Sequence, residues 1–192
     1  MYKLVLAGLS ALFMTAAACA QSNQTMNNTS SNSNILVACF SATGTTARIA
    51  EKVAAATGGT LYAITPAEPY TGADLDWTDK HSRSSREMND PKARPELAGE
   101  KIDMARYEVI FVGYPIWWDL APRIVETFLD RYDLRGKILI PFATSGGSGI
   151  ANSAAALKKA YSQAAWRPGR LLNRAGEAEI RAWVEQVMEA EN

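Results

Sequence analysis

A run of six apolar residues, ILVACF at residues 35–40, sets the first constraint on the fold. No polar residue interrupts it, which is typical of a strand buried on both faces of a parallel sheet. Strand and helix patterns then alternate along the chain. The predicted strands are residues 35–40, 60–64, 108–113, 137–144 and 164–173. The predicted helices are residues 45–57, 77–89, 123–132, 149–163 and 177–191. This alternation predicts a parallel α/β sheet with right-handed crossovers.

Ligand sites in such sheets lie at the carboxyl ends of the strands. Three segments follow predicted strands and are rich in Gly, Ser, Thr or Trp: residues 41–46, 114–119 and 145–149. We therefore expect one site built from these three segments.

The first segment is a turn of small residues that opens a helix, SATGTT. Its members are Ser41, Ala42, Thr43, Gly44, Thr45 and Thr46. Backbone N–H groups and the helix dipole favour an anion at such a turn. A P-loop needs a lysine, and no lysine occurs in the turn or before Lys52. A dinucleotide fingerprint needs three glycines at fixed spacing, and the turn contains only Gly44. The turn therefore favours a mononucleotide phosphate, and the alternative is a Ser/Thr-rich helix cap.

Residues 41–46 resemble the phosphate loop of the flavodoxin family, whose pattern is roughly S/T-x-T-G-x-T directly after the first strand. The resemblance covers about residues 35–189. It is strongest to bacterial flavodoxin-like proteins with a long segment after the second strand and a Trp-Trp loop after the third. It implies a doubly wound five-stranded parallel sheet, order 2-1-3-4-5, with helices on both faces and non-covalent FMN.

The resemblance also assigns roles to the other two segments. The loop after the third strand would contact the flavin ring; its residues are Tyr114, Pro115, Ile116, Trp117 and Trp118. Either Trp117 or Trp118 would stack on the ring, because an indole offers a flat apolar face, and Tyr114 would line the ring edge. The loop after the fourth strand would be the second flavin-ring loop; its residues are Ser145, Gly146, Gly147, Ser148 and Gly149.

A long polar segment, residues 70–95, follows the second strand. Trp77, His81, Arg83 and Arg86 are candidates to reach a cofactor or substrate, and the alternative is a solvated excursion with a short helix at about residues 77–89. We expect His81 to be exposed and Arg83 to reach the pocket. Cys39 is expected to be a buried, non-catalytic thiol. One cysteine and one histidine in the folded part are too few for a structural zinc site, so no metal is expected.

The N-terminus carries an expected export signal. Lys3 precedes an almost unbroken apolar run at residues 4–18, and 15 residues are short of the roughly 20 that a spanning helix needs. Residues 1–18 are predicted to be a signal peptide that is removed with lipidation of Cys19. The alternative is ordinary signal-peptide cleavage after residue 20. Residues 19–34 then form a disordered polar tether, and residues 35–192 the folded domain. The protein is expected in the periplasm or cell envelope, with a lipid anchor as its only membrane contact.

Charge separates the functions that a flavin would allow. The chain has 20 basic and 20 acidic residues, which excludes an electrostatic case for nucleic acid. Removing residues 1–18 takes away only Lys3, which leaves 19 basic and 20 acidic residues and a net charge of −1. Electron-shuttling flavodoxins are typically strongly acidic, so this small excess counts against a freely diffusing carrier. Electron transfer is still the leading expectation, with unknown donor and acceptor. The alternatives are an NAD(P)H-dependent, quinone-reductase-like FMN oxidoreductase and a non-catalytic flavin-binding protein. No catalytic acid or base is identified.

Overall fold

The computed structural model describes residues 34–190. Its sheet is parallel, in the order β2-β1-β3-β4-β5, as the resemblance implied. The strands are β1 (Ile35–Cys39), β2 (Thr60–Ala63), β3 (Val109–Pro115), β4 (Ile138–Thr144), β5 (Ala165–Trp166) and β6 (Arg170–Leu171). The helices are α1 (Thr45–Thr57), α2 (Arg83–Asn89), the 3-10 turn η1 (Met104–Arg106), α3 (Arg123–Asp130), α4 (Ala151–Ala160) and α5 (Glu177–Glu189).

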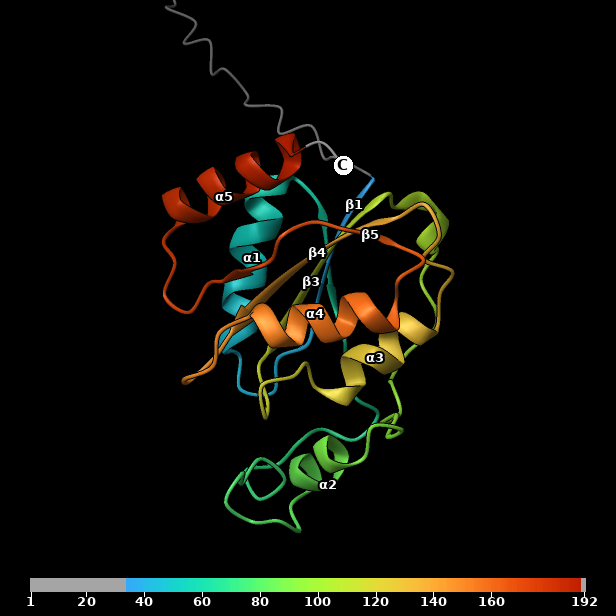
Figure 1. Ribbon diagram of the computed structural model, residues 1–192, viewed down its shortest axis with the longest axis vertical. Helices are drawn as coiled ribbons and strands as arrows, with labels where there is room; N and C mark the ends of the chain where they lie inside the picture. The colour runs from blue at the N-terminus through green and yellow to red at the C-terminus, as the bar shows by residue number, and fades with distance from the viewer. Residues whose placement is uncertain (1–33, 191–192) are drawn as a thin grey trace, which may run out of the picture.

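Helices cover both faces of the sheet (Figure 1). Successive residues of β1 point to opposite faces, so Leu36 packs with α3 and α4 while Val37 packs with α1 and α5. The inward stripe of α5 contains Ile180, Trp183, Val184 and Val187, the four residues expected from the helical period. Because both faces are covered, β1 is buried at every position, which explains its unbroken apolar run.

The predicted fifth strand is divided into two short strands, β5 and β6, that both pair with β4. Leu139 and Phe142 of β4 are three residues apart, whereas their partners Trp166 and Arg170 are four apart. The extra residue is typical of a β-bulge. At the break, a side chain on Gly169 would start 2.6 Å from the carbonyl oxygen of Pro141, so the strands meet too closely for any residue but glycine.

The polar segment after β2 is a closed excursion beyond the carboxyl ends of the strands (Figure 1). Its ends are joined by an antiparallel bridge between Pro66 and Leu97. The expected helix from residue 77 begins only at Arg83, because Ser82 caps it by accepting a hydrogen bond from the Ser85 amide at 3.2 Å. This bridged stem holds the excursion over the edge of the sheet where the site was expected.

Candidate functional site

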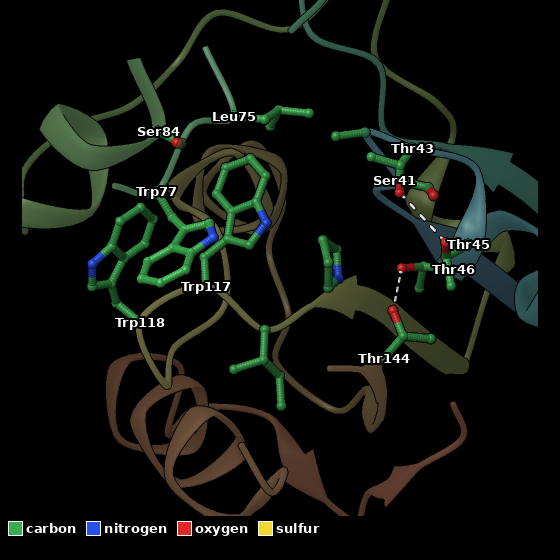
Figure 2. A pocket seen from close by; sticks show the side chains of 13 residues that line it. Ser41, Thr43, Thr45, Thr46, Leu75, Trp77, Ser84, Trp117, Trp118 and Thr144 are labelled. Atoms are coloured by element: carbon green, nitrogen blue, oxygen red, sulfur yellow. Dashed lines mark hydrogen bonds between the residues drawn. The ribbon is translucent and has the colours of Figure 1, made fainter. Parts of the chain in front are cut away.

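A pocket of about 430 Å³ opens at the carboxyl ends of β1, β3 and β4. Figure 2 shows tryptophan rings along one side and hydroxyl groups along the other. The lining consists of Ser41, Ala42, Thr43, Thr45, Thr46, Leu75, Trp77, Ser84, Pro115, Ile116, Trp117, Trp118 and Thr144. No member of this lining carries an ionisable carboxylate, imidazole, amine or thiol. The pocket can therefore hold a planar, partly polar ligand, but its walls supply no acid or base.

The loop after β1 is not a side-chain cap for α1. Gly44 occupies the N-cap position with φ of 81°, in the left-handed region that favours glycine, and no side chain caps the helix. The hydroxyls of Thr43 and Thr45 are exposed and lie 3.4 Å from each other. The amides of the first helical turn thus remain available to an anion, as the anion-site interpretation requires.

A buried hydrogen bond fixes this loop to the end of β4. The hydroxyls of Thr46 and Thr144 lie 2.8 Å apart and both residues are nearly inaccessible (Figure 2). The bond sets the position of the first turn of α1 relative to the neighbouring strand end. Sequence analysis missed Thr144 because it was counted as the last strand residue before the glycine-rich loop.

The Trp-Trp loop after β3 turns tightly between Trp117 and Leu120. The amide of each donates to the carbonyl of the other at 2.9 Å. The two residues between them, Trp118 and Asp119, have φ of 46° and 63°. Positive φ at both positions is the pattern of a type I′ turn, which normally contains Asn-Gly. Strain of about 1–3 kcal/mol for each such residue is typical of functional sites. The side-chain amide of Asn152 donates a hydrogen bond to the Asp119 carboxylate and holds the turn in place.

The three tryptophans of the pocket differ in how firmly they are held. Trp117 is half-buried and meets Phe40 and Tyr70 edge to face, with ring centroids 5.6 Å and 5.3 Å apart. Trp118 is 45% exposed, and Trp77, from the excursion, is 75% exposed. Trp117 is therefore the fixed aromatic wall of the pocket, while the other two lie nearer the solvent.

Tyr70 connects the excursion to this wall. Its hydroxyl donates to Glu87 at 2.5 Å, and burial together with this carboxylate raises the pKa of Tyr70. The Arg83 guanidinium lies 4.0 Å from the centre of the Tyr70 ring and donates to Glu87 at 2.7 Å. Arg83 does not line the pocket, so the expectation that it reaches the pocket is wrong. Its guanidinium contacts the Tyr70 ring and Glu87 instead. His81 is exposed, as expected.

One further expectation is corrected by the placement of a side chain. Tyr114 does not line the pocket: it is 0% exposed, its hydroxyl lies 3.2 Å from that of Ser153, and burial raises its pKa to about 12. Alternation along β3 turns Tyr114 into the core under α4. Gly44 shapes its loop without lining the pocket.

The glycine-rich loop also lies outside the pocket lining. None of Ser145, Gly146, Gly147, Ser148 and Gly149 belongs to it. The Ser145 hydroxyl accepts from the Gly147 and Ser148 amides at 3.1 and 2.8 Å, and the Ser145 amide donates to Asn173 at 2.7 Å. The first two bonds lie within the loop, and the third joins it to the segment after β6. Of the end of β4, only Thr144 is in the pocket lining.

The excursion supplies the lining residues that sequence analysis missed, Leu75 and Ser84, and places Trp77 in the pocket. A tryptophan in an otherwise polar segment was the available signal for them.

Cys39 lies on the face of the sheet that α1 and α5 cover, where burial raises the pKa of its thiol to about 12. Such a thiol is not a nucleophile at neutral pH, in agreement with the non-catalytic role expected.

The N-terminal predictions, including Cys19 and the tether, lie outside the described residues except for Asn34. The carbonyl of Asn34 accepts from the amides of Glu108 and Val109, so the folded part includes this residue. Within residues 34–190, no helix is long and apolar enough to cross a membrane. The same residues contain no cluster of three potential metal ligands.

Comparison with known proteins gives a family and several solved structures. The family model described as Flavodoxin matches residues 34–187. A protein from Bacteroides eggerthii described as a flavoprotein is 61% identical, with 83% of this chain and 100% of that chain covered and a TM-score of 0.79. One from Bacteroides uniformis is 53% identical over 79% and 97%, with a TM-score of 0.78.

A more distant flavoprotein, from Lactobacillus acidophilus, was solved in complex with FMN. It is 19% identical, covers 82% of this chain and 99% of its own, and has a TM-score of 0.66, which shows a shared fold. None of the curated proteins compared with the chain matches it significantly.

Proposed function

Because the chain belongs to the flavodoxin family, we propose that its pocket binds FMN and that the protein transfers electrons through this cofactor. One observation carries the proposal: α1 begins at one side of the pocket with no side-chain cap, and tryptophans form the opposite side. The Lactobacillus flavoprotein with the same fold holds FMN, which supports the choice of flavin.

The residues present fit FMN. The volume of about 430 Å³ is within the range of cofactor pockets, roughly 300–1,000 Å³. Ser41, Thr43 and Thr45 would bind the phosphate together with the first-turn amides of α1, and Trp117 would hold the ring. The hydroxyls and amides would position the phosphate, and the aromatic wall would exclude water from one face of the ring.

Bound FMN would supply the redox chemistry, since the cofactor and not the protein carries electrons in flavoproteins. The pocket lining contains no titratable side chain that could act as an acid or base. This lining suits a cofactor that reacts at its own ring. An NAD(P)H-dependent oxidoreductase is the first alternative to electron transfer. A flavin-binding protein without turnover is the remaining alternative.

The visible spectrum of the purified protein tests this proposal. We expect a yellow protein with flavin absorption, or a colourless one that takes up added FMN. Reductive titration should then proceed in two separate one-electron steps. A single two-electron step, with rapid NADPH oxidation in the presence of a quinone, would favour the oxidoreductase. A protein that neither contains nor binds FMN would contradict the central proposal.

We place the protein in the cell envelope, exported by residues 1–18 and anchored by a lipid on Cys19. The sequence AAAC at residues 16–19 supports lipidation, although ordinary cleavage after residue 20 would also export the chain. Without residues 1–18 the net charge of the chain is −1. So small a charge gives little electrostatic steering to basic partners, which counts against a freely diffusing carrier. Cell fractionation checks this: Cys19→Ser should move the protein from the membrane to the soluble fraction, and unchanged membrane association would rule out the lipid anchor.

A further inference from the structure

We propose that Arg48 is a phosphate-binding residue that makes the pocket specific for the phosphorylated flavin. The inference rests on the proposed function and extends it to a residue outside the phosphate-loop motif and outside the pocket lining. It answers the question that the missing P-loop lysine leaves open, which is where a positive charge for the phosphate comes from.

The backbone of α1 directs Arg48 to the phosphate loop. Thr45 begins the helix, so Arg48 is its fourth residue, and its amide donates to the Gly44 carbonyl at 3.2 Å. Side chains in a helix lean towards the N-terminus and cover the preceding turn. Accordingly, the guanidinium nitrogen Nη1 of Arg48 lies 3.7 Å from the point where a side chain on Gly44 would begin. The guanidinium therefore lies beside Gly44 in the phosphate loop.

Arg48 forms no ion pair with any residue of the described part of the chain. Among residues 34–190, no carboxylate lies within 4.0 Å of its guanidinium, and the first turn of α1 contains no acidic residue. Glu51 of α1 and Glu177 of α5 line the same surface groove as Arg48, and neither forms an ion pair with it. A cation at a helix N-terminus is opposed by the helix dipole. A bound phosphate at this terminus would reverse the sign of that interaction, because both the helix and the arginine then face an anion.

The consequence is selectivity for charge. Riboflavin has the same ring and no phosphate, so Arg48 should affect only FMN. The second ionisation of a phosphate monoester has a pKa near 6. A fixed cation favours the dianion over the monoanion, so the contribution of Arg48 should increase between about pH 5 and pH 7.

Fluorescence titration of flavin into the flavin-free full chain measures this contribution. We expect Arg48→Gln to weaken FMN binding about 5- to 10-fold at low ionic strength, where exposed charges are least screened. In 0.5 M salt the ratio of variant to wild-type Kd should approach one, and it should increase from pH 5 to pH 7. Riboflavin binding should be unchanged. Arg48→Lys should restore part of the affinity, because it keeps the charge and loses the planar fork of donors.

Arg181→Gln is the matched control, since Arg181 lines the same groove from α5 and its loss changes the net charge equally. It should leave the Kd for FMN within about twofold of wild type. Equal FMN affinity in wild type and Arg48→Gln would overturn the inference, as would an equal loss in Arg181→Gln or an equal loss for riboflavin. Failure of the wild type to bind FMN at any salt concentration would instead contradict the proposed function itself.

Discussion

Replacing Gly113 with alanine is expected to lower the free energy of unfolding by about 3 kcal/mol, because the new methyl group has no room in the core. A Cβ atom on Gly113 would lie 2.2 Å from Cζ of Phe142, its partner on β4, and 2.5 Å from Cε2. The Phe142 side chain is 0% exposed and also meets Trp183 edge to face, so its ring cannot move into solvent. Urea unfolding of the flavin-free protein measures the change, and the midpoint of thermal unfolding should fall by about 6–12 °C.

Gly147→Ala is the control for this prediction. Gly147 is exposed, no atom lies within 4 Å of the position of its added Cβ, and its φ lies outside the left-handed region. Its unfolding free energy should stay within about 0.5 kcal/mol of wild type or rise slightly, because alanine restricts the unfolded chain more than glycine does. If both variants were equally stable, the packing of Phe142 against Gly113 would not limit this part of the core.

Replacing Trp117 with leucine is expected to weaken FMN binding about 10- to 100-fold. Stacking of an aromatic side chain on a planar base contributes about 1–3 kcal/mol, and a flavin ring offers a comparable surface. Leucine remains apolar, so the change removes the flat indole face without adding a polar group to the pocket. Flavin fluorescence titration gives the Kd, and an unfolding curve of each variant separates a binding defect from a folding defect.

The comparison with Trp118→Leu and Trp77→Leu decides which tryptophan holds the ring. Phe40 and Tyr70 fix Trp117, so it loses little conformational freedom when a ligand binds, whereas Trp118 and Trp77 are 45% and 75% exposed. We expect their replacement to weaken FMN binding less than fivefold. A larger loss of FMN affinity for Trp118→Leu than for Trp117→Leu would show that Trp118, and not Trp117, stacks on the ring.

The order of elements was predictable because it depends on repeating patterns, and the strand order followed from the resemblance to the flavodoxin family. The buried run of β1 and the inward stripe of α5 each repeat the period of their element, and the structure confirms both. The position of the pocket was predictable for a related reason. In a parallel sheet all strands end at the same edge, so the loops after β1 and β3 had to meet.

The side chains that line the pocket were less predictable. Tyr114 was assigned to the ring edge, but its place in the alternation of β3 turns it into the core. Of the end of β4, Thr144 lines the pocket, whereas residues 145–149, the predicted second flavin loop, do not. A motif records which residue types follow a strand, and it does not record the direction in which each side chain points.

The sequence alone determined the parallel α/β class, the edge at which the pocket forms and the uncharged turn after β1, because periodicity and glycine placement act over a few neighbouring residues. The flavodoxin fold followed from the resemblance of residues 41–46 and the two later loops to that family. Only the tertiary structure decided that Trp117 is the fixed wall, that Trp77 reaches the pocket from the excursion, and that Arg48 lies unpaired beside Gly44. Each of these depends on contacts between segments far apart in the chain or on the orientation of one side chain. Such contacts follow from packing in three dimensions, on which the local pattern of residues places no constraint.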